Sequence, residues 1–301
     1  MLQEVDLQVI GVDIGGTWMR AAVVHSGGDI GDVLRVPTAR GRRAQKIVDD
    51  VVSLISRVGL TVEAEVSAVG IGVPTTVDER SRLDPCPNLP TMAAYPLAST
   101  LANRLGKPVF IENDASCFAL GEWRFGAGRG ANLLVGITLG TGIGLGVVVG
   151  GRLLRGAHGR AGEIWRSPAN VECGEASFRN VEACVSGSAL EDFYASATGV
   201  RLAGDQIARL ADENDRPARL AFERLGRALE NTLLWLSDLL DPDVIVLGGA
   251  VVASFRHFED PVMGALRDRP VKLVTSELGD SAALYGAAMV AFSGLQEWSQ
   301  T

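Results

Sequence analysis

The sequence predicts an α/β fold whose main feature, a glycine-rich pair of strands, occurs twice. Residues 9–28 and 133–151 each have the order apolar strand, Gly/Thr turn, apolar strand and Gly-Gly pair. Around them, short apolar strands repeatedly precede segments with helical spacing, which is typical of sheets covered by helices. A chain of 301 residues with 47% hydrophobic content can hold one large domain or two lobes with separate cores.

The first half of the chain is predicted to alternate between strands and helices. Residues 8–36 form three short strands with tight turns, and residues 43–58 form a helix because their apolar side chains recur at helical spacing. Two buried strands follow at 68–73 and 108–112. The second of these strands leads into a helix at about 115–125.

The second half begins with the repeated strand pair and ends in helices. Residues 155–190 have many glycines and little periodicity, which predicts a long functional loop that enters a helix near Ser186. The longest helix, 217–240, stops before Pro242 because proline disfavours a helical conformation in the preceding residue. Further along, strands are predicted at 244–247 and 271–275, and a helix of small residues at 281–292.

The two glycine-rich turns predict a binding site for a polyphosphate. Such turns present backbone N–H groups without side chains, so they can surround an anion. A hinge near residues 116–132, midway between the repeats, would let both turns close on one ligand. Residues 140–146 are not a dinucleotide fingerprint, because that motif must open a helix and a valine-rich strand follows here. The alternative is that both segments are ordinary hairpins.

Composition and charge restrict the class of protein. The net charge of −8 disfavours a nucleic-acid partner. No apolar stretch has the length of a membrane span and the first residues are acidic, so we expect a cytoplasmic protein without a membrane partner. The cysteines are widely spaced and form no C-x-x-C pair, so we expect reduced, mostly buried thiols at Cys86, Cys117, Cys173 and Cys184.

The first glycine-rich turn has a carboxylate and a hydroxyl beside it. Asp13 ends the preceding apolar strand, where its carboxylate can hold Mg²⁺ against phosphates directly or through water. Thr17 offers a hydroxyl to the same phosphates. The simpler alternative for Asp13 is a turn-forming aspartate.

Further polar candidates lie at a strand end and in the irregular loop. Asn113 and Asp114 end one strand and start a helix, and ligands gather at strand ends in open α/β sheets. A helix N-terminus keeps a carboxylate ionised, as a general base for a hydroxyl requires, but Asp is also a preferred helix cap. Glu163 and Glu182 lie where no core packing needs them, and simple surface placement is their alternative.

Nine motifs in a fixed order make the pattern recognisable. The chain resembles the ROK family of sugar kinases and related repressors, within the actin-like ATPase superfamily, from about residue 8 to residue 292. The motifs are 10–17 (IGVDIGGT), 71–74 (IGVP), 87–89 (PNL), 111–115 (IENDA), 137–144 (ITLGTGIG), 156–163 (GAHGRAGE), 182–187 (EACVSG), 247–251 (LGGAV) and 283–287 (ALYGA).

The resemblance implies transfer of the γ-phosphate of ATP to a hexose hydroxyl, usually the 6-hydroxyl, with Mg²⁺. Asp114 matches the general base of the family and also contacts sugar there. The other sugar-binding positions are Asn88, Asn113, Glu163 and Glu182. The nucleotide positions are Gly15, Gly16, Thr17, Gly140, Thr141 and Gly142 for the phosphates and Gly248 and Gly249 for the adenosine.

The resemblance also implies the architecture and the assembly. The family has a two-lobed, ribonuclease H-like fold with a cleft between the lobes. Here the small lobe would comprise residues 1–117 and the returning C-terminal helix 288–301, and the large lobe residues 118–287. A homodimer is the expected assembly.

Three departures from the family pattern concern the substrate and a zinc site. The family motif G-E-x-G-H ends here in Trp165-Arg166, so the usual histidine is an arginine. A Gly-Pro of the first lobe is Thr75-Thr76. The zinc motif keeps Cys173, but its first cysteine position falls on Val171 and its last on Phe178 or Asn180. Because one or two cysteines do not make a tetrahedral site, no structural zinc is expected.

Several functions remain open at this point. A neutral gluco-configured hexose such as glucose is the first choice. A 6-kinase for kanosamine (3-amino-3-deoxyglucose), of the kind found in antibiotic pathways, is the alternative, because carboxylates left unpaired by Arg166 would attract an amino sugar. A sugar-sensing regulator without turnover is disfavoured because Asp13, Thr17 and Asp114 are all present. A repressor is disfavoured because only about seven residues precede the first strand.

Overall fold

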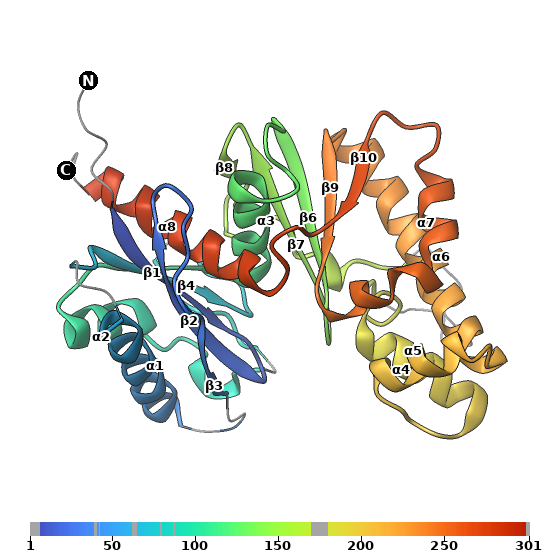
Figure 1. The fold of residues 1–301 in the computed structure, drawn as a ribbon, viewed down its shortest axis with the longest axis horizontal. Helices are drawn as coiled ribbons and strands as arrows, with labels where there is room; N and C mark the ends of the chain where they lie inside the picture. The colour runs from blue at the N-terminus through green and yellow to red at the C-terminus, as the bar shows by residue number, and fades with distance from the viewer. Residues whose placement is uncertain are drawn as a thin grey trace.

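The computed structural model describes residues 7–38, 41, 43–61, 65–78, 80–86, 88–169 and 180–298. Within these residues the chain forms two five-stranded sheets that lie side by side, with two helices between them (Figure 1). The prediction of an α/β fold is therefore confirmed.

Each sheet is built around one of the two glycine-rich strand pairs. The first sheet has the order β3-β2-β1-β4-β5, and the second has the order β10-β9-β6-β7-β8. The strands of the first sheet are β1 (Gln8–Ile14), β2 (Trp18–His25), β3 (Leu34–Pro37), β4 (Ala68–Val73) and β5 (Val109–Asn113). The strands of the second are β6 (Leu133–Leu139), β7 (Ile143–Val149), β8 (Arg152–Leu153), β9 (Val244–Gly248) and β10 (Lys272–Thr275).

The two sheets share one topology. In each, an antiparallel pair (β1 with β2, β6 with β7) is extended by parallel strands on the side of its first member. The last paired residues are Ile14 with Met19 in the first pair and Leu139 with Ile143 in the second. The Gly/Thr turns therefore occupy equivalent places, and the sequence repeat is also a structural repeat.

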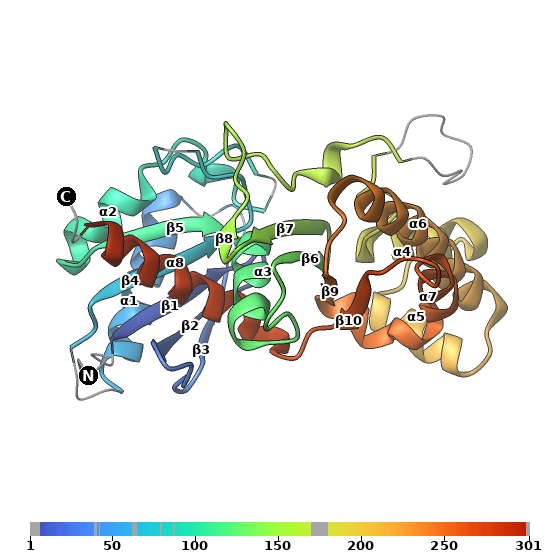
Figure 2. The same cartoon turned by 90° about the horizontal axis from the view of Figure 1, so that it is seen from above.

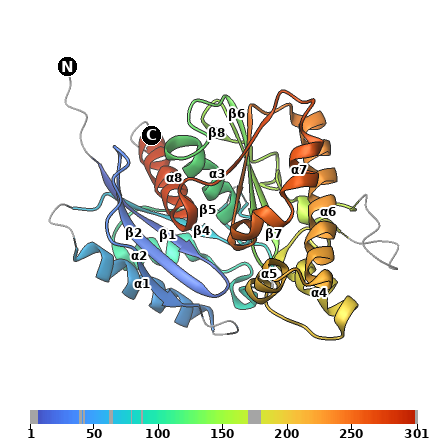
Figure 3. The same cartoon turned by 45° about the vertical axis from the view of Figure 1, so that its right-hand side comes forward.

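Helices cover both faces of both sheets. The outer face of the first sheet packs against α1 (Ala44–Gly59) and α2 (Leu97–Leu105). The outer face of the second sheet packs against a group that includes α4 (Gly187–Thr198) and α6 (Arg216–Leu240), as Figure 3 shows. The central helices are α3 (Asp114–Phe125) and α8 (Ala282–Trp298). The remaining helices are α5 (Gly204–Asp212), α7 (Glu259–Ala265), η1 (Pro90–Met92), η2 (Ile164–Arg166), η3 (Ala250–His257) and η4 (Gly279–Ser281).

The alternation of side chains along the strands explains this layering. Ile10, Val12 and Ile14 of β1 point to the α1 side, whereas Val9 packs against α8. Both faces are apolar because each is covered by helices, as expected of strands buried on two sides.

The two sheets are held together by close packing of α3 against α8. A Cβ atom added to Gly286 of α8 would lie 1.6 Å from the Cys117 carbonyl oxygen of α3, and one added to Gly121 would lie 2.1 Å from the Ala282 oxygen. The backbones of the two helices therefore touch at these glycines. Figure 2 shows α8 running along the first sheet to reach this contact.

The longest helix begins and ends for the expected local reasons. The Asp215 side chain caps α6 by accepting a hydrogen bond from the Ala218 N–H at 2.9 Å. Asp241 leaves the helix in the left-handed conformation, with φ of 46°, immediately before Pro242. The sequence analysis did not predict α2, α5 or α7. These helices are short, so few apolar positions repeat along them.

One expectation about the cysteines was wrong. Cys86 and Cys117 are buried thiols, but Cys184 is disulfide-bonded. The spacing of cysteines along the chain does not show which of them converge in the fold, so the reduced state could not be inferred from spacing alone. Cys173 lies outside the described residues.

The residue bounds of the two lobes stay a prediction. The predicted boundary between residues 117 and 118 falls inside α3. The C-terminal helix α8 packs against β1, β4 and β5 of the first sheet and also against α3. In the described part of the chain, no helix is long and apolar enough to cross a membrane.

Candidate active site

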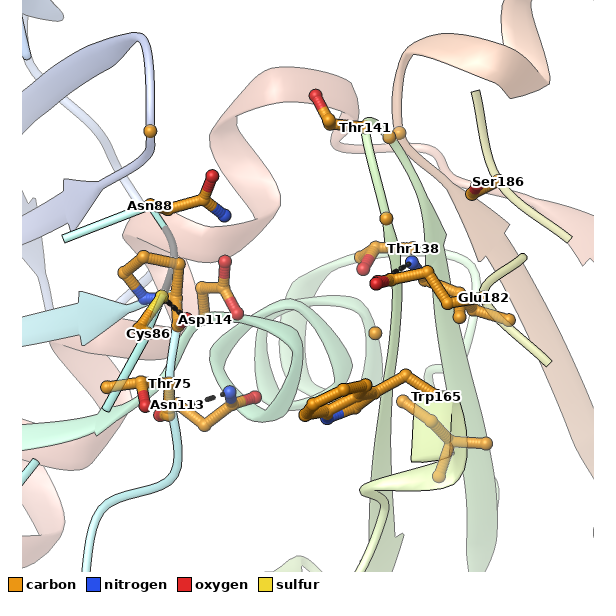
Figure 4. A pocket seen from close by; sticks show the side chains of 18 of the residues that line it. Thr75, Cys86, Asn88, Asn113, Asp114, Thr138, Thr141, Trp165, Glu182 and Ser186 are labelled. Atoms are coloured by element: carbon orange, nitrogen blue, oxygen red, sulfur yellow. Dashed lines mark hydrogen bonds between the residues drawn. The ribbon is translucent and has the colours of Figure 1, made fainter. Parts of the chain in front are cut away.

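A cavity of about 720 Å³ lies between the two sheets and contains most of the predicted site. Figure 4 shows its two walls facing each other, with Asn88, Asn113 and Asp114 on one side and Thr141 and Glu182 on the other. The predicted residues that line it are Asp13, Gly16, Thr17, Asn88, Asn113, Asp114, Gly140, Thr141, Gly142, Glu163, Glu182 and Gly249. Gly15 and Gly248 are not among its lining residues.

The two Gly/Thr turns face the same cavity from different sheets. The first is closed by a hydrogen bond from the Gly15 N–H to the Trp18 oxygen at 2.9 Å, and the second by one from Gly140 to Gly142 at 3.0 Å. The Gly15 N–H is therefore used inside its turn, which explains why Gly15 shapes the site without lining it.

The N-terminus of α4 lies against the second turn. The Gly187 N–H donates to the Gly140 oxygen at 2.7 Å, and the Ser188 hydroxyl donates to the Thr141 oxygen at 2.9 Å. Ser186 caps the helix by accepting from the Ala189 N–H at 3.0 Å. A helix N-terminus favours negative charge, so this arrangement suits a phosphate group at the second turn.

The paired glycines at the end of β9 allow close approach of the backbone on two sides. Gly249 has φ of +89°, and a Cβ atom there would lie 2.5 Å from the Leu139 oxygen. A Cβ atom on Gly248 would lie 2.3 Å from the Phe118 ring. Gly249 thus borders the cavity, while Gly248 lets the second sheet pack on α3.

The cap of α3 is Asn113 and not Asp114. The Asn113 side-chain oxygen accepts from the Ala115 N–H at 2.9 Å and from the Ser116 N–H at 3.1 Å. Its amide nitrogen donates to the Thr75 oxygen at 3.3 Å. The interpretation of Asp114 as a helix cap was therefore wrong. Asp114 is the first helical residue, and its carboxylate borders the cavity.

The Asp114 carboxyl group has an unusually high pKa. Burial raises this pKa to about 7, and the negative charges of Asp13 and Glu163 act in the same direction. The expectation that the helix N-terminus would keep the group ionised is corrected here, because loss of hydration outweighs the hydrogen bond from the Ala115 N–H. A carboxylate with a pKa near neutrality suits a general base.

Asp13 is buried and paired with a cation. Its Oδ2 atom lies 3.1 Å from Nη2 of Arg20, which stands opposite it in the β1–β2 pairing. Burial raises the pKa of Asp13, and the charge and hydrogen bond of Arg20 partly offset this. Mg²⁺ in phosphate sites is typically held by one or two carboxylates together with phosphates and water. One buried carboxylate beside the first turn fits that mode.

A metal site made of protein side chains alone is not seen in the described residues. No group of three or more His, Cys, Asp or Glu side chains is arranged there to hold an ion. The zinc-motif positions Val171, Cys173 and Phe178 lie outside the described residues. The absence of structural zinc therefore stays a prediction.

The wall formed by the second sheet carries two carboxylates and an aromatic ring. Glu182 accepts from the Ile143 N–H at 3.2 Å, and burial raises its pKa. Glu163 accepts from the indole N–H of Trp165 at 2.5 Å. The guanidinium of Arg166 lies over the Trp165 ring, 4.5 Å from its centre. Among the described residues, no ion pair joins Arg166 to either glutamate.

Several lining residues were not predicted from the sequence. Thr138, which lies two residues before Gly140, is one of them, and the pattern of the second turn could have revealed it. Arg20 could have been found because it is a charged residue within an otherwise apolar strand. Asp280 and Trp165 come from separate segments, and only the folded chain brings them to the cavity.

Comparisons with known proteins agree with this geometry. The model of the ROK family matches residues 9–293. A glucokinase of Thermotoga maritima is 33% identical over 94% of this chain and 97% of the relative. A glucokinase of Streptomyces coelicolor is 34% identical over 94% of this chain and 96% of the relative. The crystal structure of a ROK family glucokinase from Streptomyces griseus, in complex with glucose and AMPPNP, has a TM-score of 0.82 at 34% identity and covers 95% and 99% of the two chains.

The fold is a two-lobed, actin-like ATPase fold, as in known sugar kinases. Its two equivalent sheets place their glycine-rich turns around one cavity. The chain belongs to the ROK family, because the family model matches most of its length. It is a sugar phosphotransferase.

Proposed function

We propose that this protein uses ATP to phosphorylate the 6-hydroxyl of a neutral, gluco-configured hexose such as glucose. The observation that carries the proposal is the position of Asp114, a half-buried carboxylate in the same cavity as both Gly/Thr turns and the predicted sugar-binding side chains. Two glucokinases at 33% and 34% identity support glucose, and the glucokinase solved with glucose and AMPPNP supports ATP.

The reaction follows from the roles of these groups. Asp114 accepts the proton of the 6-hydroxyl as that oxygen forms a bond to the γ-phosphorus. The bond from the γ-phosphorus to the β,γ-bridging oxygen breaks, and its electron pair leaves with ADP. Backbone N–H groups of the two turns bind the phosphates, and the dipole of α4 favours their negative charge. Mg²⁺ beside Asp13 would neutralise part of their charge.

An ADP-release assay with a panel of sugars tests the proposal. We expect the highest kcat/KM with glucose among glucose, mannose, N-acetylmannosamine, kanosamine and fructose. No ADP release above the rate without sugar for any of them would contradict the proposal. A higher kcat/KM with kanosamine would support the second candidate.

The second candidate, a kanosamine 6-kinase, is favoured by one observation. Asp114, Glu163 and Glu182 line one cavity, while Arg166 lies over Trp165 and pairs with neither glutamate among the described residues. An ammonium group could therefore gain about 1.5–3 kcal/mol from each charged hydrogen bond to a carboxylate. Arg166 also lines the cavity and repels such a group, which keeps the neutral hexose first.

The pH dependence is expected to show an acid limb near pH 7. Asp114 accepts a proton only when ionised, so kcat/KM for the sugar should fall about tenfold per pH unit below its pKa and level off above it. Steady-state rates across this range measure the limb. In a Glu163→Gln variant the limb should move to lower pH, because a charge that raises the pKa of Asp114 is lost. An acid limb near the ordinary carboxyl pKa in the wild-type protein would contradict this assignment.

We also propose that the protein forms a homodimer and is located in the cytoplasm. Light scattering coupled to size-exclusion chromatography measures the first, and a mass of one chain at all concentrations would contradict it.

A further inference from the structure

We propose that Arg20 is a further catalytic residue, whose guanidinium contacts the transferred phosphoryl group, and that Asp13 positions it. The inference builds on the proposed use of ATP. It begins with the distribution of charge around the cavity, where acidic side chains predominate. Among the described lining residues, only Arg20 and Arg166 carry a permanent positive charge, and no lysine lines the cavity.

The two arginines lie in different parts of the site. Arg166 follows Glu163 in the loop and lies over the Trp165 ring, at the predicted sugar-binding wall. Arg20 lies on β2, directly after the first Gly/Thr turn, and stands opposite Asp13. A phosphoryl group in transit carries negative charge on three oxygens, and enzymes of this chemistry place cations against it. Arg20 can supply such a cation at the end of the cavity beside the first Gly/Thr turn, where the phosphates would bind.

The Arg20 side chain is held in place but keeps donors for a ligand. Nη2 lies 3.1 Å from Oδ2 of Asp13, and Nη1 donates to the Asp280 backbone oxygen at 3.1 Å. The Asp280 carboxylate is 3.2 Å from Nη1 but is almost fully exposed, so its contribution is small. An arginine has five N–H donors, so these contacts leave some unused.

The Nε atom shows that stability alone does not explain this arrangement. It is buried and has no hydrogen-bond partner among the described residues. A buried donor without a partner costs stability, and such groups are rare in proteins. Arg20 therefore keeps a buried donor without a partner, although this costs stability. The side chain nevertheless borders the cavity, and 27% of it is exposed.

In the reaction, Arg20 acts on charge and moves no proton. As the sugar oxygen bonds to the γ-phosphorus and the bond to the ADP oxygen breaks, Asp114 holds the sugar proton. Arg20 donates N–H bonds to the non-bridging oxygens of the phosphoryl group, where charge develops. These bonds are stronger in the transition state than with bound ATP, so they should raise kcat more than affinity.

Two Arg20 variants and a matched control test the inference in the full chain. Arg20→Met removes the charge and keeps much of the side-chain length, and Arg20→Lys keeps the charge. Arg35→Met is the control. Arg35 stands opposite Arg20 on the adjacent strand β3, and its guanidinium lies over Trp18. The measurements are kcat, KM for sugar and ATP, and the affinities for ADP alone and for ADP with aluminium fluoride plus sugar, which mimics the transferring phosphoryl group.

We expect Arg20→Met to lower kcat by about 10²–10³-fold, and affinity for the aluminium fluoride complex by a similar factor. Affinity for ADP and the KM for sugar should stay within about threefold of wild type. Arg20→Lys should recover part of kcat, and Arg35→Met should behave as wild type.

A purely structural role for Arg20 gives a different result. If Arg20 only neutralised Asp13, ADP and the aluminium fluoride complex would lose affinity equally, which would overturn the inference. An unchanged kcat in Arg20→Met would overturn it as well. If Arg20→Met does not fold, the same measurements are made on Arg20→Lys. Wild-type kcat in Arg20→Lys, together with wild-type affinity for both ligands, would count against a geometric role for the guanidinium. A wild-type protein that phosphorylates no sugar of the panel would instead contradict the proposed function.

Discussion

Replacing Asp114 by Asn is expected to lower kcat by about 10²–10⁴-fold, the usual effect of losing a general base. The amide has nearly the same shape but cannot accept the sugar proton. The KM for sugar should change much less, because the amide can still hydrogen-bond the hydroxyl. Steady-state kinetics with the preferred sugar of the panel measures both constants.

Asp192→Asn is the matched control for Asp114→Asn. Asp192 also lines the cavity, but its carboxylate forms an ion pair with Arg201 on the exposed side of α4. The same chemical change there should leave kcat close to the wild-type value. An Asp114→Asn variant that keeps more than about half of wild-type kcat would rule out Asp114 as the general base.

Replacing Gly286 by Ala is expected to cause the largest loss of stability among the variants considered. The new Cβ atom would lie 1.6 Å from the Cys117 oxygen, so α8 and α3 would have to separate. Overpacking costs about 1–3 kcal/mol and occasionally more. Because a backbone carbonyl cannot rotate away, we expect at least about 3 kcal/mol, which corresponds to a fall in Tm of about 6–12 °C. Thermal unfolding followed by calorimetry measures it.

The control for Gly286→Ala is Gly264→Ala. Gly264 is also a helical glycine, in α7, but a Cβ atom there would meet nothing within 4 Å. Alanine is the better helix former, so this variant should be more stable by about 0.5–1 kcal/mol. Equal Tm values for the two variants would show that the contact between α3 and α8 tolerates a methyl group.

The contact at Gly286 also illustrates why part of the fold could not be predicted from the sequence. The helix at 281–292 was predicted from its small residues, and α8 confirms that the helix exists. Its neighbour α3 lies more than a hundred residues earlier in the chain, so no local pattern could indicate that their backbones touch. The same holds for the disulfide at Cys184, which depends on convergence in space.

The candidate site shows a similar division. The Gly/Thr turns, Asp13 and Asp114 could be located because each lies at the end of an apolar strand, and strand ends meet at one edge of a sheet. The sequence analysis expected the helix N-terminus to keep Asp114 ionised, whereas the pKa of this group is raised. A helix N-terminus is visible in the sequence, whereas the extent of burial and the nearness of Asp13 and Glu163 are not.

The sequence by itself determined the repeated strand pair, the α/β class and the residue types needed for phosphoryl transfer, because these depend on local periodicity and on turn chemistry. Tertiary structure alone decided that Asn113 caps α3 and leaves Asp114 to face the cavity, and that Arg20 pairs with Asp13. It also placed Arg166 over Trp165, with no ion pair to a glutamate among the described residues. These outcomes depend on which charged groups come within a few ångströms of one another and lose water together, and such distances are set only when both sheets pack against α3 and α8.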